Sequence, residues 1–334
     1  MKTYTVAVLG ATGAVGREMI KILEERRFPV GKLVLLASEK SVGTTVSFNG
    51  EDVKVRLAEE NAFNGCDVVL GASPNAVAKR FAPHIVRAGA IFVDNSSAFR
   101  MDENVPLVVP EINPEDVKKH SGIISNPNCS TIIALVAVNG INKLSPIKAM
   151  TVSTYQAVSG AGAGGPKELL AQTAALAEGK QVAPEVFRYR IAYNLIPQIG
   201  DFLDNGYTTE EMKMQNEGRK ILHLPSLSVG CTCVRVPVVR SHSISISLKT
   251  ERDISVEEAK SAIAAAPGCR LVDDPANYVY PMPLDTSDQD LVYVGRVRRD
   301  IVSGGLSLFC CGDQVRKGAA TNTVQIAETA LGIN

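Results

Sequence analysis

The chain has 334 residues, of which 45% are hydrophobic and 21% are charged. This length predicts two domains, and the composition is that of an ordinary globular protein. Lys+Arg and Asp+Glu both number 35, so the formal net charge is zero. A balanced charge argues against a nucleic-acid-binding protein and against attachment to an anionic membrane surface.

The N-terminal and cysteine patterns bear on location. Residues 2–9 run directly into a β-like segment without a cleavage site, and the apolar runs are too short for a membrane span. The seven cysteines show neither a disulfide framework nor the spacing of zinc ligands, so we expect no metal site and a reducing cytoplasm. Four of the cysteines are expected to lie in the core: Cys231, Cys233, Cys310 and Cys311.

The first motif is a glycine-rich turn between a predicted strand and a predicted helix. Thr3–Leu9 is a short β-rich run, and residues 17–25 have the apolar spacing of a helix. Between them lies Gly-Ala-Thr-Gly-Ala-Val-Gly, residues 10–16. In this context the turn can hold a pyrophosphate at the helix N-terminus. Glycines also serve ordinary tight turns, but the placement favours a dinucleotide-binding site.

The second predicted strand, Lys32–Ala37, ends in residues that bear on the choice of cofactor. Ser38, Lys40 and Ser41 offer two hydroxyls and a cation. These groups favour NADP, because a basic group accommodates the ribose 2′-phosphate. Glu39 leaves some use of NAD open, since an acidic residue at this point usually binds the free 2′-hydroxyl.

Strands and helices then alternate along the chain. Val68–Leu70 and Ala90–Val93 are predicted strands, and Val77–Ala88 is a predicted helix between them. This alternation predicts an α/β fold with a doubly wound parallel sheet of the Rossmann type, which binds ligands outside the carboxyl ends of its strands. Arg100 follows such a strand end, where it could hold an anion or be an ordinary surface arginine.

Cys129 is the residue that points to catalysis. It follows an Asn-Pro-Asn turn after the apolar run at residues 122–124, and residues 132–138 form an apolar segment with helical character. Cys129 is therefore predicted at the start of a helix, where free backbone N–H groups and the helix dipole favour a thiolate. The alternative is a small buried apolar cysteine.

The second half of the chain is richer in strands. Predicted strands cover residues 148–158, 228–239, 241–248, 291–297 and 306–311, and predicted helices cover residues 167–178, 212–222, 255–266 and 319–331. A second glycine-rich loop at residues 160–166 follows a strand, which favours a close approach to a ligand over a flexible connection. The elements predict a second, α+β domain with a mostly antiparallel or mixed sheet.

A catalytic cysteine needs a group that transfers protons near neutral pH, and histidine is the usual choice. Of the four histidines, His242 lies in phase with apolar residues of a predicted strand, so a buried strand residue and a base are equally open. A capping box of Thr208 and Glu211 begins the helix that ends at residue 222. Glu210 and Lys213 share one face of it, as a solvated ion pair or as part of a site.

Five motifs occur in an order that matches a known family. They are residues 10–16, residues 125–131 around Cys129, residues 155–162, Arg-Val-Pro at 235–237 with His242, and residues 316–320. Together they resemble the aspartate-semialdehyde dehydrogenases over essentially the whole chain. The cysteine motif combined with Arg-Val-Pro and the histidine is quite specific, whereas the glycine motif is shared with many other reductases.

The resemblance implies a division of the chain into two domains. Residues 1–127 would form an NADP-binding Rossmann domain, completed by a C-terminal helix at residues 315–334. Residues 128–314 would form the catalytic, substrate-binding and dimerisation domain. The resemblance also implies a homodimer or homotetramer that acts on a small-molecule substrate.

The resemblance further implies roles for individual residues. Cys129 would be the nucleophile and His242 the general acid and base, and Gln156 would orient the substrate. Substrate contacts would come from Arg235 for the α-carboxylate, Glu210 for the amino group, Arg100 and Lys213 for the phosphate, and Asn128. Cofactor contacts would come from Gly10, Thr12, Gly13, Ala14, Val15, Ser38, Lys40, Ser41, Ser159, Gly160 and Gln314. Gln314 stands where the family usually has Asn, and Lys40 stands where many members have Arg.

The implied reaction is the reversible, NADP-dependent reduction of L-aspartyl 4-phosphate to L-aspartate 4-semialdehyde, in the biosynthesis of lysine, threonine and methionine. The Cys129 thiolate would attack the acyl carbon, phosphate would leave, and hydride would reduce the thioester while His242 protonates the oxygen. Two alternatives stay open. One is another acyl-phosphate reductase, such as N-acetyl-gamma-glutamyl-phosphate reductase, and the other is a non-catalytic NADP-binding sensor.

Overall fold

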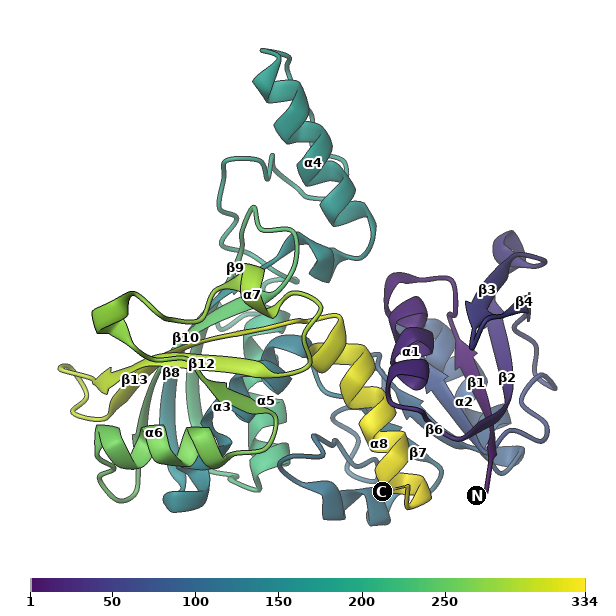
Figure 1. Ribbon diagram of the computed structural model, residues 1–334, viewed down its shortest axis with the longest axis horizontal. Helices are drawn as coiled ribbons and strands as arrows, with labels where there is room; N and C mark the ends of the chain where they lie inside the picture. Colours follow the sequence, from purple (N-terminus) through teal and green to yellow (C-terminus); the bar gives the residue numbers. More distant parts are fainter. Residues whose placement is uncertain (1, 334) are drawn as a thin grey trace. The chain divides into compact units, whose positions relative to one another are not determined.

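The computed structural model describes residues 2–333, and its contacts divide the chain into two units, each with its own sheet (Figure 1). The first unit contains residues 1–128 and 319–334, and the second contains residues 129–318.

The first unit is built on a seven-stranded sheet with the order β3-β4-β2-β1-β5-β6-β7. The strands are β1 (Tyr4–Leu9), β2 (Val30–Ala37), β3 (Thr45–Phe48), β4 (Glu51–Leu57), β5 (Val68–Gly71), β6 (Ile91–Asp94) and β7 (Ile123–Ser125). Every neighbouring pair is parallel except β3 with β4, so the predicted parallel sheet is confirmed.

Helices cover both faces of this sheet. α1 (Ala14–Glu25) and α8 (Thr321–Leu331) share one apolar core with Val8, and α2 (Asn75–Arg87) shares another with Leu9. Adjacent residues of β1 belong to different cores because successive side chains of a strand point to opposite faces. Strands buried on both sides are typical of a doubly wound sheet, as predicted.

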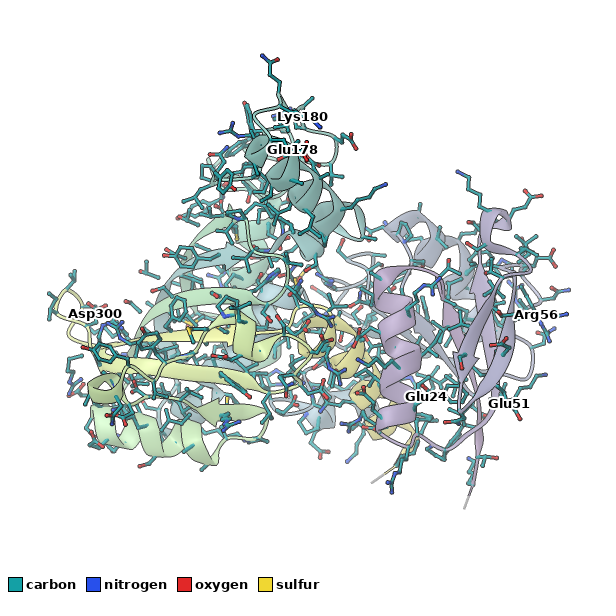
Figure 2. All side chains as sticks on the ribbon, turned by 45° about the horizontal axis from the view of Figure 1, so that its top comes forward. Glu24, Glu51, Arg56, Glu178, Lys180 and Asp300 are labelled. Carbon is teal, nitrogen blue, oxygen red and sulfur yellow. The ribbon has the colours of Figure 1, made fainter. Side chains whose placement is uncertain are left out.

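The strands β3 and β4 were not predicted, and their exposure explains why. β4 exposes five of its seven side chains and β3 two of its four, and Glu51 and Arg56 of β4 extend into solvent (Figure 2). Neither strand therefore contains the continuous apolar run that marks a buried parallel strand.

The second unit is built on a six-stranded mixed sheet with the order β11-β12-β13-β10-β8-β9. The strands are β8 (Ile147–Gln156), β9 (Ser228–Arg235), β10 (His242–Thr250), β11 (Cys269–Leu271), β12 (Val292–Arg299) and β13 (Leu306–Gly312). β8 is parallel to β9, whereas β10 is antiparallel to both β8 and β13. The predicted α+β domain with a mixed sheet is confirmed.

The helices of this unit are α3 (Cys129–Leu144), α4 (Gly164–Ala177), α5 (Thr209–Leu222), α6 (Val256–Ala265) and the short α7 (Pro283–Thr286). Residues 132–138 of α3 are all buried, as expected of an apolar helix beneath a sheet. The capping box of Thr208 and Glu211 is present at the start of α5.

Several predicted boundaries are wrong, and three of them lie around residues 156–166 and 235–239. The strand predicted at residues 228–239 ends at Arg235, because the Val238 N–H bonds the Val236 carbonyl in a turn around Pro237. The strand predicted to reach residue 158 ends at Gln156 and is followed by a 3₁₀ turn, η3 (Val158–Ala161). The next helix begins in the glycine-rich stretch, three residues before the predicted start.

Candidate active site

Four strand ends of the second sheet meet at one edge. In the parallel register of β8 and β9, Gln156 lies beside Arg235, and each is the last residue of its strand. His242 begins the antiparallel strand β10, so it lies at the same edge. β13 ends opposite His242, at Gly312. Residues that are far apart in the sequence are therefore brought together by strand direction and register.

Cys129 lies at the start of α3, as predicted, and faces this edge. Its Sγ is 3.5 Å from Nε2 of His242, and both residues belong to the second unit. The N-terminal end of a helix favours a thiolate. Cys129 is partly exposed, so the alternative of a buried apolar cysteine is wrong for this residue. The four cysteines predicted to lie in the core are buried.

His242 is fully buried, and its ring is oriented by the backbone. The N–H of Ala157 donates to Nδ1 over 3.1 Å. Because an N–H can only donate, the neutral ring carries its proton on Nε2, the nitrogen that faces Cys129. Burial, together with the nearby charge of Arg235, lowers the pKa of His242 to about 3. His242 is therefore neutral at pH 7 and presents an N–H donor to the sulfur.

A buried polar chain lies beside His242. Gln156 Oε1 accepts a hydrogen bond from Thr154 Oγ1 at 3.0 Å, which leaves its amide nitrogen to donate to Glu210 Oε1 at 3.3 Å. Glu210 Oε2 accepts a further bond from Lys213 Nζ at 2.8 Å. Glu210 is 8% exposed, so the alternative of a solvated ion pair is wrong. The network fixes the orientation of the Gln156 amide next to the histidine.

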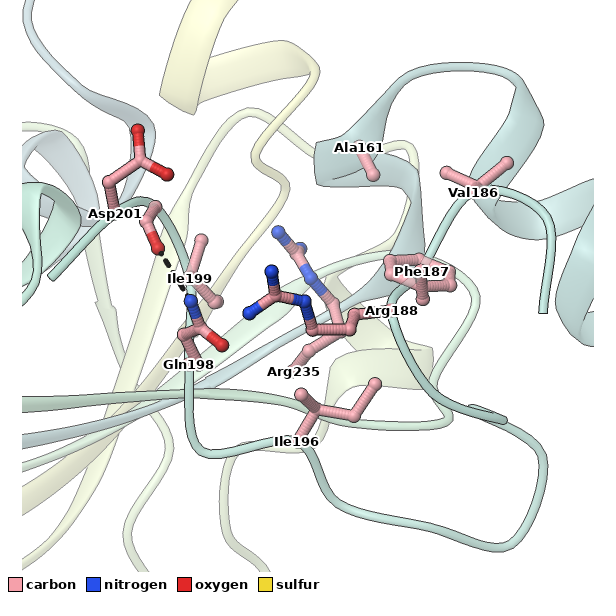
Figure 3. A pocket seen from close by; sticks show the side chains of 10 residues that line it. Ala161, Val186, Phe187, Arg188, Ile196, Gln198, Ile199, Asp201 and Arg235 are labelled. Atoms are coloured by element: carbon pink, nitrogen blue, oxygen red, sulfur yellow. Dashed lines mark hydrogen bonds between the residues drawn. The ribbon is translucent and has the colours of Figure 1, made fainter.

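Arg235 is the buried cation of this edge. It is 7% exposed, yet its guanidinium makes one hydrogen bond within residues 2–333, from Nη1 to the Ala157 carbonyl at 2.6 Å. Its backbone exchanges two hydrogen bonds with Ile196, which fixes its position. The guanidinium also borders a cavity of about 390 Å³ (Figure 3). A buried guanidinium with unused donors beside a cavity is suited to bind a carboxylate.

Gly160 lies between the two functional side chains of this edge. A Cβ at this position would lie 2.9 Å from Nη1 of Arg235 and 3.2 Å from Cε1 of His242. Only glycine allows the backbone to come this close to both groups. The glycine-rich stretch therefore approaches the site closely, and it is not a flexible connection, since it forms η3 and the first turn of α4.

Gln314 is held at both ends of its side-chain amide. The amide nitrogen donates to the Ser159 hydroxyl, and Oε1 accepts from the Ser241 N–H at 2.9 Å. Ser241 directly precedes His242, and Ser159 directly precedes Gly160. The glutamine thus connects the end of β13 to the two segments that border the histidine.

The first unit contains a cavity of about 440 Å³ at the carboxyl ends of β1, β2 and β5. Doubly wound sheets bind ligands at this place. Four predicted cofactor residues line the cavity: Gly10, Thr12, Gly13 and Ser38. Two others, Ala14 and Val15, form the start of α1, and Ser41 Oγ lies 3.0 Å from Thr12 Oγ1.

The wall of this cavity requires a glycine where the turn after β1 approaches the turn after β5. Gly10 has φ +92°, and a Cβ there would lie 2.4 Å from the carbonyl oxygen of Ala72. The turn after β1 therefore lies directly against the turn after β5, with its backbone accessible to a ligand. This cradle, at the N-terminus of α1, fits the pyrophosphate of a dinucleotide.

Some lining residues were missed by sequence reasoning. Arg80 of α2 and Ser73 after β5 border the cavity with Glu39, whereas Lys40 is not among the lining residues. Lys40 lies in the short 3₁₀ turn η1 (Glu39–Ser41) and is exposed. Arg80 is one of several charged residues of α2, so the sequence pattern did not single it out.

Arg100 and Asn128 lie in the first unit and are buried. Arg100 donates from Nε to the Asn126 carbonyl and from Nη2 to the Asn95 carbonyl, each at 2.9 Å. The alternative of an ordinary surface arginine is therefore wrong. The roles of both residues as phosphate or substrate ligands stay predictions.

The described chain shows neither a metal cluster nor a membrane-spanning helix. Residues 2–333 contain no cluster of three His, Cys, Asp or Glu side chains that could hold a metal ion. Over the same residues, no helix has the length and apolar character needed to cross a bilayer.

The chain matches two known domain families. Residues 5–120 match the family described as semialdehyde dehydrogenase, NAD binding domain, and residues 138–317 match semialdehyde dehydrogenase, dimerisation domain. A protein named aspartate-semialdehyde dehydrogenase from Aquifex aeolicus (strain VF5) is 51% identical over 330 residues, which cover 97% of each chain.

Solved structures share the fold along the full length. The crystal structure of aspartate semialdehyde dehydrogenase II complexed with ASA from Vibrio cholerae has a TM-score of 0.97 and 44% identity over 99% of each chain. Aspartate semialdehyde dehydrogenase with NADP from Candida albicans has a TM-score of 0.77 and 25% identity over 100% of each chain. On these matches in sequence and structure, the chain belongs to the aspartate-semialdehyde dehydrogenase family of oxidoreductases.

Proposed function

We propose that this protein catalyses the reversible, NADP-dependent reduction of L-aspartyl 4-phosphate to L-aspartate 4-semialdehyde, in the biosynthesis of lysine, threonine and methionine. The observation that carries the proposal is the 3.5 Å approach of Cys129 Sγ to His242 Nε2, at the sheet edge that also holds the buried Arg235. The names of the relatives favour aspartate semialdehyde over an N-acetylated glutamyl substrate, and a catalyst over a non-catalytic sensor.

The nucleophile is the thiolate of Cys129. It attacks the acyl carbon, the bond from that carbon to the phosphate oxygen breaks, and a thioester remains on the sulfur. Backbone N–H groups at the start of α3 and the Nε2–H of His242 supply hydrogen bonds to the oxygen of the tetrahedral intermediate. NADPH supplies the hydride that reduces the thioester carbonyl.

The protonation state of His242 defines how this residue takes part in the reduction of the thioester. A neutral ring whose Nδ1 already accepts a backbone N–H does not readily release its Nε2 proton. His242 therefore donates a hydrogen bond to the alkoxide, and to the sulfur as the carbon–sulfur bond breaks and the aldehyde leaves. Of the two roles predicted for His242, general acid and general base, this proposal keeps only hydrogen-bond donation from Nε2 while the thioester is reduced to the aldehyde.

The two charged ends of the substrate require separate anchors. Arg235 binds the α-carboxylate, because its buried fork retains unused donors. Glu210 binds the amino group, and Gln156 positions the acyl group next to the thiol. Lys213, which reaches Glu210 at 2.8 Å, binds the phosphate together with the remaining predicted ligands, Arg100 and Asn128.

The cofactor cavity of the first unit binds NADP in this proposal. The Gly10 cradle would hold the pyrophosphate. Ser38 of the cavity wall, with Lys40 and Ser41 of the turn that follows it, would bind the ribose 2′-phosphate. Ser159, Gly160 and Gln314 border the nicotinamide. The dimerisation-domain match supports a homodimer, with a tetramer as the larger assembly. Seven free cysteines support a reducing cytoplasm.

A phosphate-dependent assay tests the function. Oxidation of aspartate semialdehyde is followed by the absorbance of reduced cofactor, with NADP or NAD and with or without inorganic phosphate. We expect turnover that requires phosphate and is faster with NADP. A rate that is independent of phosphate would refute the phosphorylating reaction, and faster turnover of the N-acetylated glutamate semialdehyde would refute the substrate.

A further inference from the structure

The cavity beside Arg235 holds a second arginine that the proposed reaction does not use. Arg188 and Arg235 both line the cavity of about 390 Å³, whose lining residues all belong to the second unit. Figure 3 shows the two guanidinium groups pointing into this space from different segments of the chain. One carboxylate, that of Asp201, also borders the cavity.

The charge of Arg188 is not compensated by any of residues 2–333. Over residues 2–333 its guanidinium makes no hydrogen bond and no ion pair. The carboxylate of Asp201 is likewise unpaired in the described part of the chain. Two guanidinium groups against one carboxylate leave the cavity with a positive potential, which attracts an anion.

The loop that carries Arg188 is fixed on both sides by α4. The buried carboxylate of Glu168 accepts the backbone N–H groups of residues 185–187. One helical turn later, Gln172 Oε1 accepts the N–H groups of residues 191–192 at 3.0 and 3.1 Å. Five backbone donors on two buried side chains hold the segment in place, so the position of Arg188 is preorganised although its side chain is exposed.

The same loop also touches Arg235. The ring of Phe187 lies 5.9 Å from the Arg235 guanidinium carbon, and Phe187 itself lines the cavity. One short segment therefore covers the first arginine with an aromatic ring and places the second arginine beside it. This arrangement suits a ligand whose anionic end contacts both guanidinium groups.

We propose that Arg188 is a second carboxylate-recognition residue, which binds the α-carboxylate of the substrate together with Arg235. This inference rests on the proposed function, because that function assigns the carboxylate to Arg235. A carboxylate between two guanidinium groups accepts charge-assisted hydrogen bonds from both. The exposed arginine also raises the rate of encounter with an anionic substrate, and this contribution falls as salt screens the charge.

Three variants test the proposal: Arg188→Ala, Arg188→Lys, and Arg190→Ala as a matched control. Arg190 lies in the same loop and is exposed, but it does not line the cavity. We expect Arg188→Ala to raise KM for aspartate semialdehyde about five- to tenfold with kcat unchanged. Arg188→Lys should give an intermediate KM, and Arg190→Ala should match the unsubstituted protein. The effect of Arg188→Ala should shrink in 0.5 M KCl.

Arg235→Lys, measured in parallel, distinguishes a failure of the role proposed for Arg188 from a failure of the proposed function. A large rise in KM for Arg235→Lys with an unchanged KM for Arg188→Ala would overturn the role of Arg188 and leave the proposed function standing. An unchanged KM in both variants would show that this cavity does not bind the substrate, which refutes the carboxylate assignment itself. A lower kcat for Arg188→Ala at unchanged KM would also overturn the proposal.

Discussion

The thiol site of the second unit and the cofactor cavity of the first unit are built from different chemical groups. The thiol site uses buried functional side chains, among them His242, Gln156 and Glu210, which are held by hydrogen bonds to one another or to the backbone. The cofactor cavity is formed largely by turns after strands, where backbone and small side chains such as Gly10 and Thr12 form the wall. Catalysis at the thiol site therefore depends on particular functional groups. Cofactor binding in the first unit depends on backbone shape and a few exposed charges.

The largest effect is expected at the sulfur itself. Cys129→Ser should lower kcat by about 10³-fold or more, because a serine hydroxyl is not ionised near neutral pH. NADP affinity, measured by fluorescence titration, should not change, since the cofactor cavity is formed by other residues. Cys269, the other partly exposed cysteine, provides the control, and Cys269→Ser should keep full turnover. Retention of a tenth of the activity by Cys129→Ser would contradict the nucleophile assignment.

The next largest effect tests how tightly the thiol site is packed. Gly160→Ala should lower kcat/KM by about 10²-fold, since the added Cβ would lie 2.9 Å from Arg235 Nη1 and must displace it or His242. Gly230→Ala in β9 is the matched control, because its Cβ would meet only Tyr207 Oη, at 3.9 Å. Equal activities of the two alanine variants would show that the site tolerates movement of the arginine.

Sequence reasoning was most successful where the pattern was local. The turn that ends at Cys129 and the apolar helix after it predict the start of α3 correctly, because both signals lie within a few residues. The glycine-rich turn at residues 10–16 predicts the cofactor cavity for the same reason. The roles of Gln156, Arg235 and His242 came from family resemblance, since their meeting depends on the register of β8, β9 and β10.

Two other residues, Arg188 and Arg80, lie in no sequence pattern that predicts their place beside a cavity. Arg188 lies in an irregular segment whose path is set by Glu168 and Gln172, and a helical pattern does not reveal which buried side chains will bind a distant backbone. Arg80 is one of several exposed charges on its helix, and only the fold shows that it faces the cavity. Non-local hydrogen bonds and the direction of exposed side chains are therefore the parts that sequence alone does not supply.

A smaller effect concerns the pH dependence of stability at the thiol site. The folded ring of His242 stays neutral down to about pH 3, whereas the unfolded ring is protonated below its ordinary pKa of 6.5. Between these values the unfolded state binds more protons, so stability falls as pH falls. Urea unfolding should show a loss of up to about 1.4 kcal/mol per pH unit that is absent in His242→Gln. Equal slopes for both proteins would contradict the neutral, buried ring.

The smallest effect belongs to the cofactor cavity, where charges are exposed and screened. Arg80 lines this cavity and Lys40 does not, although Lys40 was the predicted cation. If the cavity wall decides which cation meets the 2′-phosphate, Arg80→Ala should raise Kd for NADP about three- to fivefold, with a smaller change for Lys40→Ala. Kd for NAD should stay the same in both variants, because NAD lacks that phosphate. Fluorescence titrations with both cofactors measure this. A larger loss in Lys40→Ala would show that the exposed turn η1 moves onto the phosphate when the cofactor binds, so that the wall of this cavity, unlike the thiol site, is completed by its ligand.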